Sequence, residues 1–184
     1  FKAENLNFAI VNLDDSKGEV LCEIVSSNTQ AKTVTYSVKN KNAQVYAESA
    51  NYTDKGISAQ VKTPKGDLSI ALSLLGEFNL SNLLAVIAIW SSFDWPLAQI
   101  EKSISKITTA AGRMQLFSKA DKPRCVVDYA HTPDALERAL MAVKTHKQRD
   151  SKIICVFGCG GDKDKGKRAL MGDIVAHYAD KGII

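Results

Sequence analysis

The chain has no long hydrophobic run and few cysteines. Its longest apolar run is the eight residues Leu83–Trp90, whereas a membrane-spanning helix needs about twenty. The sequence therefore argues against a transmembrane helix. Four cysteines are too few and too scattered for a disulfide framework, and we expect a reducing, cytoplasmic setting. The four cysteines are Cys22, Cys125, Cys155 and Cys159.

What the chain does have is an ordinary globular composition. Of its 184 residues, 45% are hydrophobic and 24% are charged, and the formal net charge is +4. This balance fits one domain or two small ones with a core large enough to need no disulfide or metal. The chain opens on Phe1 rather than Met and stops inside an apolar run at Ile184. We therefore expect it to be part of a longer protein.

The first part of the chain reads as short strands followed by two helices. Between residues 31 and 75, Val, Thr, Tyr and Ser alternate in short runs separated by turn residues, which predicts an antiparallel meander. The helices are expected over residues 81–92, which are almost wholly apolar, and over residues 96–107. The expected strands cover residues 33–38, 45–47, 57–61 and 68–72.

From Arg113 onward strands and helices alternate. Thr132 is suited to cap a helix whose first residue is Pro133. Strand, helix, strand, helix and strand in succession predict a parallel α/β sheet, so we place a domain boundary near residue 110. The expected strands cover residues 125–127 and 153–157 and begin again at Gly182, and the second helix covers residues 170–178.

A glycine-rich loop lies between the strand predicted at residues 153–157 and the helix predicted at residues 170–178. Residues 161–168 fit the pattern G-x-x-x-x-G-K of a phosphate-binding loop, but Arg168 stands where Ser or Thr would hold magnesium. Asp162 and Asp164 would also face the phosphates. A dinucleotide fingerprint fits less well, because Lys163 occupies the place of its third glycine. A solvated surface loop is the plain alternative. The alternating charges suit a ligand that carries both signs, such as an amino acid.

Three further groups of residues suit a nucleotide. Asp128 follows a predicted strand, where a carboxylate can accept from ribose hydroxyls, and His131 precedes a helix, where it can meet a phosphate. A purely structural role is as good an interpretation for both. Arg113 can clamp a phosphate or form an ion pair. Asn79 and Asn82 are three residues apart and can share a helix face toward an adenine edge, although Asn79 and Ser81 are also good helix caps.

Taken together, these motifs resemble those of the MurE ligases, the UDP-N-acetylmuramoyl-tripeptide synthetases of the Mur ligase family. The resemblance spans about residues 8–184 and is strongest from Gly112 on. The motifs are G-E-F-N-L-S-N at 76–82, G-R-M at 112–114, V-D-Y-A-H-T-P-D-A-L-E at 127–137 and V-F-G-C-G-G-D-K-D-K-G-K-R at 156–168.

The resemblance implies an α/β fold in two parts. Residues 1–110 would be the C-terminal part of a P-loop-type central domain, with antiparallel strands and helices. Residues 111–184 would be the first half of the Rossmann-like C-terminal ligase domain. The family's Walker A loop, carbamylated lysine and N-terminal uridine-nucleotide domain would precede this chain, and its Asp-Asn-Pro-Arg motif would follow it. We therefore expect no complete catalytic set and no activity from the 184 residues alone.

The resemblance also implies a chemistry for the full-length protein. ATP would phosphorylate the carboxylate of UDP-MurNAc-L-Ala-D-Glu, and the amine of a diamino acid would attack the acyl phosphate, with Mg²⁺ as a cofactor. Lys163 would contact the amino-acid substrate; many relatives carry arginine there, and meso-diaminopimelate is favoured over L-lysine. A cytoplasmic monomer that acts on small molecules is implied. The residues that would bind ATP are Asn79, Asn82, Arg113, Asp128, Tyr129 and His131.

Two alternatives to this assignment stay open. One is another Mur-like ligase, of the cyanophycin or folylpolyglutamate type. The other is a nucleic-acid-binding module that would use Lys163, Lys165, Lys167 and Arg168. The interleaved aspartates and the lack of an aromatic platform argue against this alternative. No metal site is expected, because Cys155 and Cys159 have no matching second pair and the three histidines show no ligand spacing. These are His131, His146 and His177.

Overall fold

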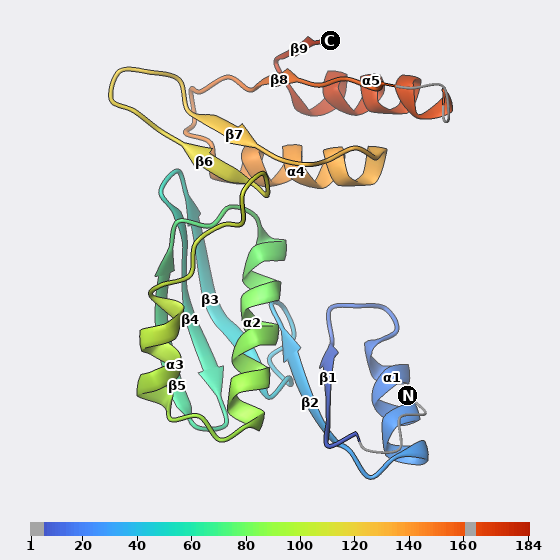
Figure 1. Ribbon diagram of the computed structural model, residues 1–184, viewed down its shortest axis with the longest axis vertical. Helices are drawn as coiled ribbons and strands as arrows, with labels where there is room; N and C mark the ends of the chain where they lie inside the picture. Colours follow the sequence, from blue (N-terminus) through green and yellow to red (C-terminus); the bar gives the residue numbers. More distant parts are fainter. Residues whose placement is uncertain (1–5, 161–164) are drawn as a thin grey trace. The chain divides into compact units, whose positions relative to one another are not determined.

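The computed structural model describes residues 6–160 and 165–184. These residues form two compact units (Figure 1). The first unit takes in the described residues up to Asn51, Ile57–Leu72 and Glu77–Ile107. The second takes in Tyr52–Gly56, Ser73–Gly76 and the described residues from Thr108 on. The predicted boundary at residue 110 stays a prediction.

The first unit contains a five-stranded sheet in the order β1-β2-β3-β4-β5. Strands β1 and β2 are parallel, with Phe8 opposite Lys32. Strands β2 and β3 are also parallel, whereas β4 and β5 are antiparallel. The elements are β1 (Phe8–Asn12), α1 (Gly18–Asn28), β2 (Lys32–Ser37), β3 (Val45–Thr53), β4 (Gly56–Thr63), β5 (Gly66–Leu72), α2 (Glu77–Ser92) and α3 (Leu97–Ile104).

The expected α/β fold class is confirmed, but the antiparallel meander through residues 31–75 is partly wrong. Strand β2 runs parallel to both of its neighbours. Helix α1 carries the chain from β1 back to the start of β2, and such a crossover produces the parallel β1–β2 pair. The parallel β2–β3 pair is short, with Tyr36 opposite Val45 and Ser37 opposite Tyr46. Alternation with a period of two predicts a strand but not its direction, and the sequence patterns predict neither β1 nor α1.

The apolar residues of the first unit meet where α2 and α3 pack on the sheet. Helix α2 contacts β1 and β2, and α3 contacts β5. Leu84 and Ile87 of α2 and Ile100 of α3 are fully buried. Helix α2 begins at Glu77, four residues before the predicted start. Asn79 and Ser81 therefore lie within the helix, and the alternative interpretation of the two as its caps does not hold.

The second unit alternates short strands with two helices that pack on each other. Thr132 caps α4, accepting the Ala135 N–H, and Pro133 is the first helical residue, so both predictions are confirmed. Beyond the segments at 52–56 and 73–76, the elements are β6 (Gln115–Phe117), β7 (Cys125–Val127), α4 (Pro133–His146), β8 (Ile154–Val156), α5 (Gly166–Tyr178) and β9 (Lys181–Ile183).

The predicted parallel sheet of this unit is only partly confirmed. Strands β8 and β9 are parallel, as expected. Strand β7 instead pairs with β6 in an antiparallel hairpin, and within residues 6–160 and 165–184 it is not paired with β8.

The described residues also include no helix long and apolar enough to cross a membrane.

Two isoleucines of α2 offer a matched test of the first unit's core. Ile87 is fully buried, and Ile89 is 40% exposed. We expect Ile87→Ala to lower the free energy of unfolding by about 2–5 kcal/mol, and Ile89→Ala by about 0.5 kcal/mol. Urea unfolding followed by tryptophan fluorescence reports on this unit, because both tryptophans, Trp90 and Trp95, belong to it. Equal losses for the two variants would contradict the described packing.

Candidate functional site

The candidate site is built on the hairpin of β6 and β7. Gln115 pairs with Val127 at the open end of this hairpin. The next residues outward, Met114 and Asp128, are joined by a hydrogen bond of 2.8 Å from the Met114 N–H to Oδ2 of Asp128. Oδ1 of the same carboxylate accepts the Ala130 N–H at 2.9 Å. Asp128 therefore connects the segment before β6 to the turn before α4.

The segment before β6 has an unusual backbone. Gly112 has φ +69° and Met114 has φ +48°, and a left-handed conformation at a non-glycine residue is uncommon and carries strain. Met114 is 1% exposed and packs against Leu75 and Ala142. The Gly112 N–H donates to Oε1 of Gln115 at 3.0 Å. Burial of Met114 and the two side-chain acceptors hold this strained segment in place.

This segment presents Arg113 to an exposed aromatic ring. The Arg113 guanidinium carbon lies 5.0 Å from the centre of the Tyr129 ring, and Tyr129 is 63% exposed. An exposed cation–π pair contributes about 0.5–1 kcal/mol. That is enough to bias the arginine toward one orientation without removing its charge from solvent.

His131 completes the group on the other side of Tyr129. The two rings meet edge to face with their centres 5.1 Å apart. Nδ1 of His131 lies 3.0 Å from the Tyr129 carbonyl oxygen. A carbonyl can only accept, so Nδ1 carries the hydrogen and Nε2 is the acceptor of the neutral ring.

The structure thus brings together four of the predicted nucleotide residues: Arg113, Asp128, Tyr129 and His131. A guanidinium on the segment before β6, together with a carboxylate, an exposed ring and an imidazole on the turn before α4, suits the phosphates, ribose and base of a nucleotide. Each Asp128 oxygen already accepts one backbone N–H. A carboxylate oxygen has two lone pairs, so each oxygen can still accept a ribose hydroxyl.

The remaining predicted site residues are not in this group. Asn79 and Asn82 lie in α2 of the first unit, Asn79 half-buried and Asn82 exposed. Lys163 lies outside the described residues. Of the glycine-rich loop, the structure describes the end, where Gly166 begins α5. Among the described residues there is no group of three or more His, Cys, Asp or Glu side chains that could hold a metal ion.

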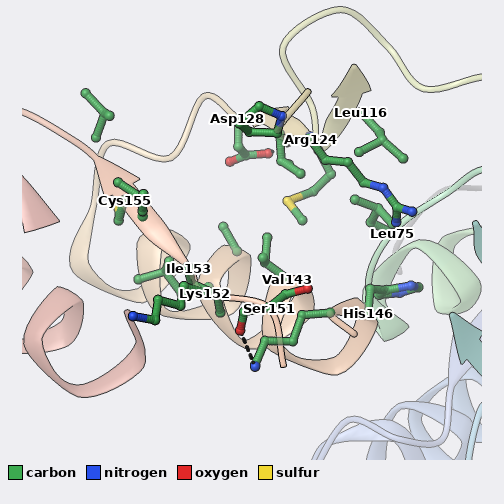
Figure 2. A pocket seen from close by; sticks show the side chains of 18 of the residues that line it. Leu75, Leu116, Arg124, Asp128, Val143, His146, Ser151, Lys152, Ile153 and Cys155 are labelled. Atoms are coloured by element: carbon green, nitrogen blue, oxygen red, sulfur yellow. Dashed lines mark hydrogen bonds between the residues drawn. The ribbon is translucent and has the colours of Figure 1, made fainter. Parts of the chain in front are cut away.

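Next to the site lies a cavity of about 830 Å³ (Figure 2). Strands β7 and β8 both line it, although they belong to different sheets. Apolar side chains of α4 contribute to the lining, among them Leu136, Leu140 and Val143. Among the predicted site residues that the structure describes, Asp128 is the one that lines this cavity. Because the other predicted site residues that the structure describes do not line this cavity, we assign the candidate site to the Arg113–His131 group.

An ion pair stands beside the same cavity. Arg124 Nη2 lies 2.5 Å from Oδ2 of Asp54, and Gln148 Nε2 donates to the same oxygen at 2.7 Å. The Arg124 guanidinium and then the Gln148 amide hold the pKa of the Asp54 carboxyl below its ordinary value. The sequence offers no signal for this pair, because its members are seventy residues apart and meet only in the folded unit.

The lowered pKa of Asp54 predicts acid sensitivity. The favourable contribution is complete above the ordinary pKa of 3.8 and is lost as the pH falls through the lower, folded-state pKa. We expect Asp54→Asn to flatten the loss of stability with falling pH in that range. Urea midpoints followed by circular dichroism between pH 7 and pH 2 would measure this effect. Parallel curves for the variant and the unaltered protein would contradict it.

Asp128 offers a second test, of the link between Met114 and Ala130. Asp128→Ala removes two hydrogen bonds to a charged acceptor, and we expect a loss of about 1–3 kcal/mol in local stability. Amide hydrogen exchange at Met114 and Ala130 should accelerate accordingly. The control is Asp134→Ala, whose side chain is 73% exposed and should have little effect on either amide. Unchanged exchange in Asp128→Ala would exclude the link.

Two family models match the sequence. One, described as Mur ligase middle domain, matches residues 1–90, and one, described as Mur ligase, glutamate ligase domain, matches residues 112–184. A relative from Pseudomonas syringae pv. tomato is 43% identical over 180 residues, which are 98% of this chain and 36% of that protein. One from Pseudomonas aeruginosa is 39% identical over 184 residues, 100% of this chain and 37% of that protein. Both are named UDP-N-acetylmuramoyl-L-alanyl-D-glutamate–2,6-diaminopimelate ligase.

Solved structures agree with this assignment. A structure of a ligase with the same name is 34% identical, with a TM-score of 0.72 over 96% of this chain and 36% of that one. MurF from Thermotoga maritima, solved with ADP, shares the fold at 14% identity and a TM-score of 0.72, over 98% of this chain and 40% of that one. This chain thus spans little more than a third of the relatives' length. The two domain models together cover most of its residues, and the chain belongs to the Mur ligase family.

Proposed function

We propose that this chain is the middle and C-terminal part of an ATP-dependent ligase of peptidoglycan precursor synthesis. The full-length protein would add meso-diaminopimelate to UDP-MurNAc-L-Ala-D-Glu. The observation that carries the proposal is the Arg113–His131 group, four nucleotide-suited side chains on two segments that the Asp128 carboxylate joins. Relatives at 37–43% identity that carry the corresponding ligase name support the choice of reaction.

The same comparisons favour this reaction over the other Mur-like ligases. A folylpolyglutamate synthetase from Lactobacillus casei is 16% identical and shares the fold alone. The five relatives at 37–43% identity include proteins from Pseudomonas and Coxiella, and all are named for 2,6-diaminopimelate. This supports meso-diaminopimelate over L-lysine, although Lys163 lies outside the described residues.

We infer the following roles toward a bound ATP. Arg113 would neutralise phosphate charge, Asp128 would accept from the ribose hydroxyls, and the exposed Tyr129 ring would offer an apolar face. His131 would offer Nε2 as an acceptor or, when protonated, a second cation. Asn79 and Asn82 would meet the adenine edge. ATP supplies the phosphoryl group that activates the substrate carboxylate, and these side chains bind and orient it.

Other parts of the proposal concern the full-length protein. Mg²⁺ would neutralise the phosphate oxygens, and its ligands would come from outside this chain. We propose that the 184 residues alone have no ligase activity, because they supply only part of the nucleotide site. The cytoplasmic location, the monomeric state and the absence of nucleic-acid binding stay predictions.

The proposal is tested by phosphate release from the full-length protein that carries this chain. With ATP, Mg²⁺ and UDP-MurNAc-L-Ala-D-Glu, we expect release that depends on meso-diaminopimelate and is much slower with L-lysine. Release that depends on L-lysine alone would overturn the substrate, and no release with either amine would overturn the reaction.

Variants of Arg113 test the assigned site. We expect Arg113→Ala to raise the KM for ATP by about tenfold to a hundredfold, since hydrogen bonds to charged groups contribute about 1.5–3 kcal/mol. The KM for ATP of Arg113→Lys should lie between those of the unaltered protein and Arg113→Ala, because lysine keeps the charge but loses the planar guanidinium. The control is Arg138→Ala on α4, an exposed arginine paired with Asp134, which should leave the KM unchanged. An unaltered KM in Arg113→Ala would remove this residue from the site.

A further inference from the structure

His146 is the last residue of α4 and is 4% exposed. Both of its ring nitrogens bond to backbone. Nδ1 lies 2.6 Å from the Thr53 carbonyl oxygen, and Nε2 accepts the Gly76 N–H at 2.9 Å. The ring also meets Tyr52 edge to face, with the centres 5.5 Å apart. Thus one side chain connects three separate stretches of sequence, all within the second unit.

These two bonds define the state of the imidazole. The Thr53 oxygen can only accept, so Nδ1 must carry a hydrogen. The Gly76 N–H can only donate, so Nε2 must be without one. The ring is therefore neutral and acts as donor at one end and acceptor at the other, which few side chains can do across such a span. Replacing it with an apolar ring would leave a buried N–H and a carbonyl without partners.

The segment held by His146 is also held by its neighbours. Asp54, next to Thr53, accepts from Arg124 and from Gln148, which follows α4. Figure 2 shows Arg124, His146 and Leu75 on the same side of the cavity. The turn at residues 52–56 and the segment at 73–76 are thus fixed to the end of α4 by side-chain bonds rather than by strand pairing.

The position of the Gly76 backbone affects where α2 begins. It is buried, has φ +90° and is followed directly by Glu77, the first residue of α2. Asn79 lies three residues after Gly76 in the sequence. At its other end, α4 starts next to the Asp128–His131 turn, capped by Thr132. One helix therefore connects the turn that carries four predicted ATP residues to the chain segment that leads to the other two.

We propose that His146 is a positioning residue for the nucleotide site. By accepting the Gly76 N–H, it fixes the backbone from which α2, the helix that carries Asn79 and Asn82, begins. In this proposal His146 acts through its bond to Gly76 and does not contact the nucleotide itself. This inference rests on the proposed function, because that proposal assigns Asn79 and Asn82 to ATP.

The first test measures the contact itself in the full-length protein that carries this chain. Hydrogen exchange of peptides covering residues 73–78 should accelerate by about tenfold or more in His146→Phe, which keeps a ring but loses the acceptor. His146→Gln, which keeps an amide acceptor, should restore part of the protection. The matched control is His177→Phe, since His177 is exposed on α5 and packs edge to face against Tyr178. Equal exchange in His146→Phe and the unaltered protein would overturn the contact.

The second test measures its consequence, with ATP as the probe and calorimetry as the readout. We expect the Kd for ATP to rise at least fivefold in His146→Phe, to recover partly in His146→Gln and to stay unchanged in His177→Phe. Faster exchange at Gly76 with an unchanged Kd would make His146 merely structural and overturn the proposal. If His146→Phe does not fold, His146→Gln and His146→Asn provide the same comparison.

The two proposals fail in distinguishable ways. Absence of phosphate release with normal ATP binding would overturn the ligase reaction, while the effect of His146 on the ATP Kd would still stand. Normal phosphate release with no effect of His146→Phe on either the Gly76 exchange or the ATP Kd would overturn the positioning role alone.

Discussion

The carboxylate of Asp128 is the interaction on which the candidate site depends. Its two oxygens accept backbone N–H groups from Met114 and Ala130, which lie on opposite sides of the β6–β7 hairpin. Without the Asp128 oxygens, the Met114 N–H would lose the acceptor that compensates for the strain of its left-handed backbone. Arg113 and Tyr129 adjoin these bonded residues, so the same carboxylate that can meet a ribose also sets the geometry of its neighbours.

This double role explains why the sequence alone does not distinguish a structural interpretation of Asp128 from a functional one. Both predict an acidic residue at the end of a strand and before a helix. The structure shows that they are compatible, because backbone bonds occupy one lone pair of each oxygen and leave the other. The residue is therefore expected to matter for stability and for nucleotide binding at once.

Local signals predicted much of the fold. The Thr132 cap and Pro133 placed the start of α4 correctly, and the apolar run at 153–157 became β8. Strand direction was mistaken at β2, because alternation is the same in parallel and antiparallel sheets. The start of α2 was mistaken by four residues, because Asn79 and Ser81 are as suited to a cap as to a first turn. The sequence predicts no role for His146, because its backbone partners lie 93 and 70 residues away in sequence.

The central claim is that the Arg113–His131 group binds the nucleotide, and hydrogen exchange of the full-length protein with a non-hydrolysable ATP analogue tests it most directly. The account predicts protection of peptides covering residues 112–115 and 128–132, together with the first turn of α2. Protection of α2 alone, with exchange at 112–115 and 128–132 unchanged at saturating analogue, would contradict it.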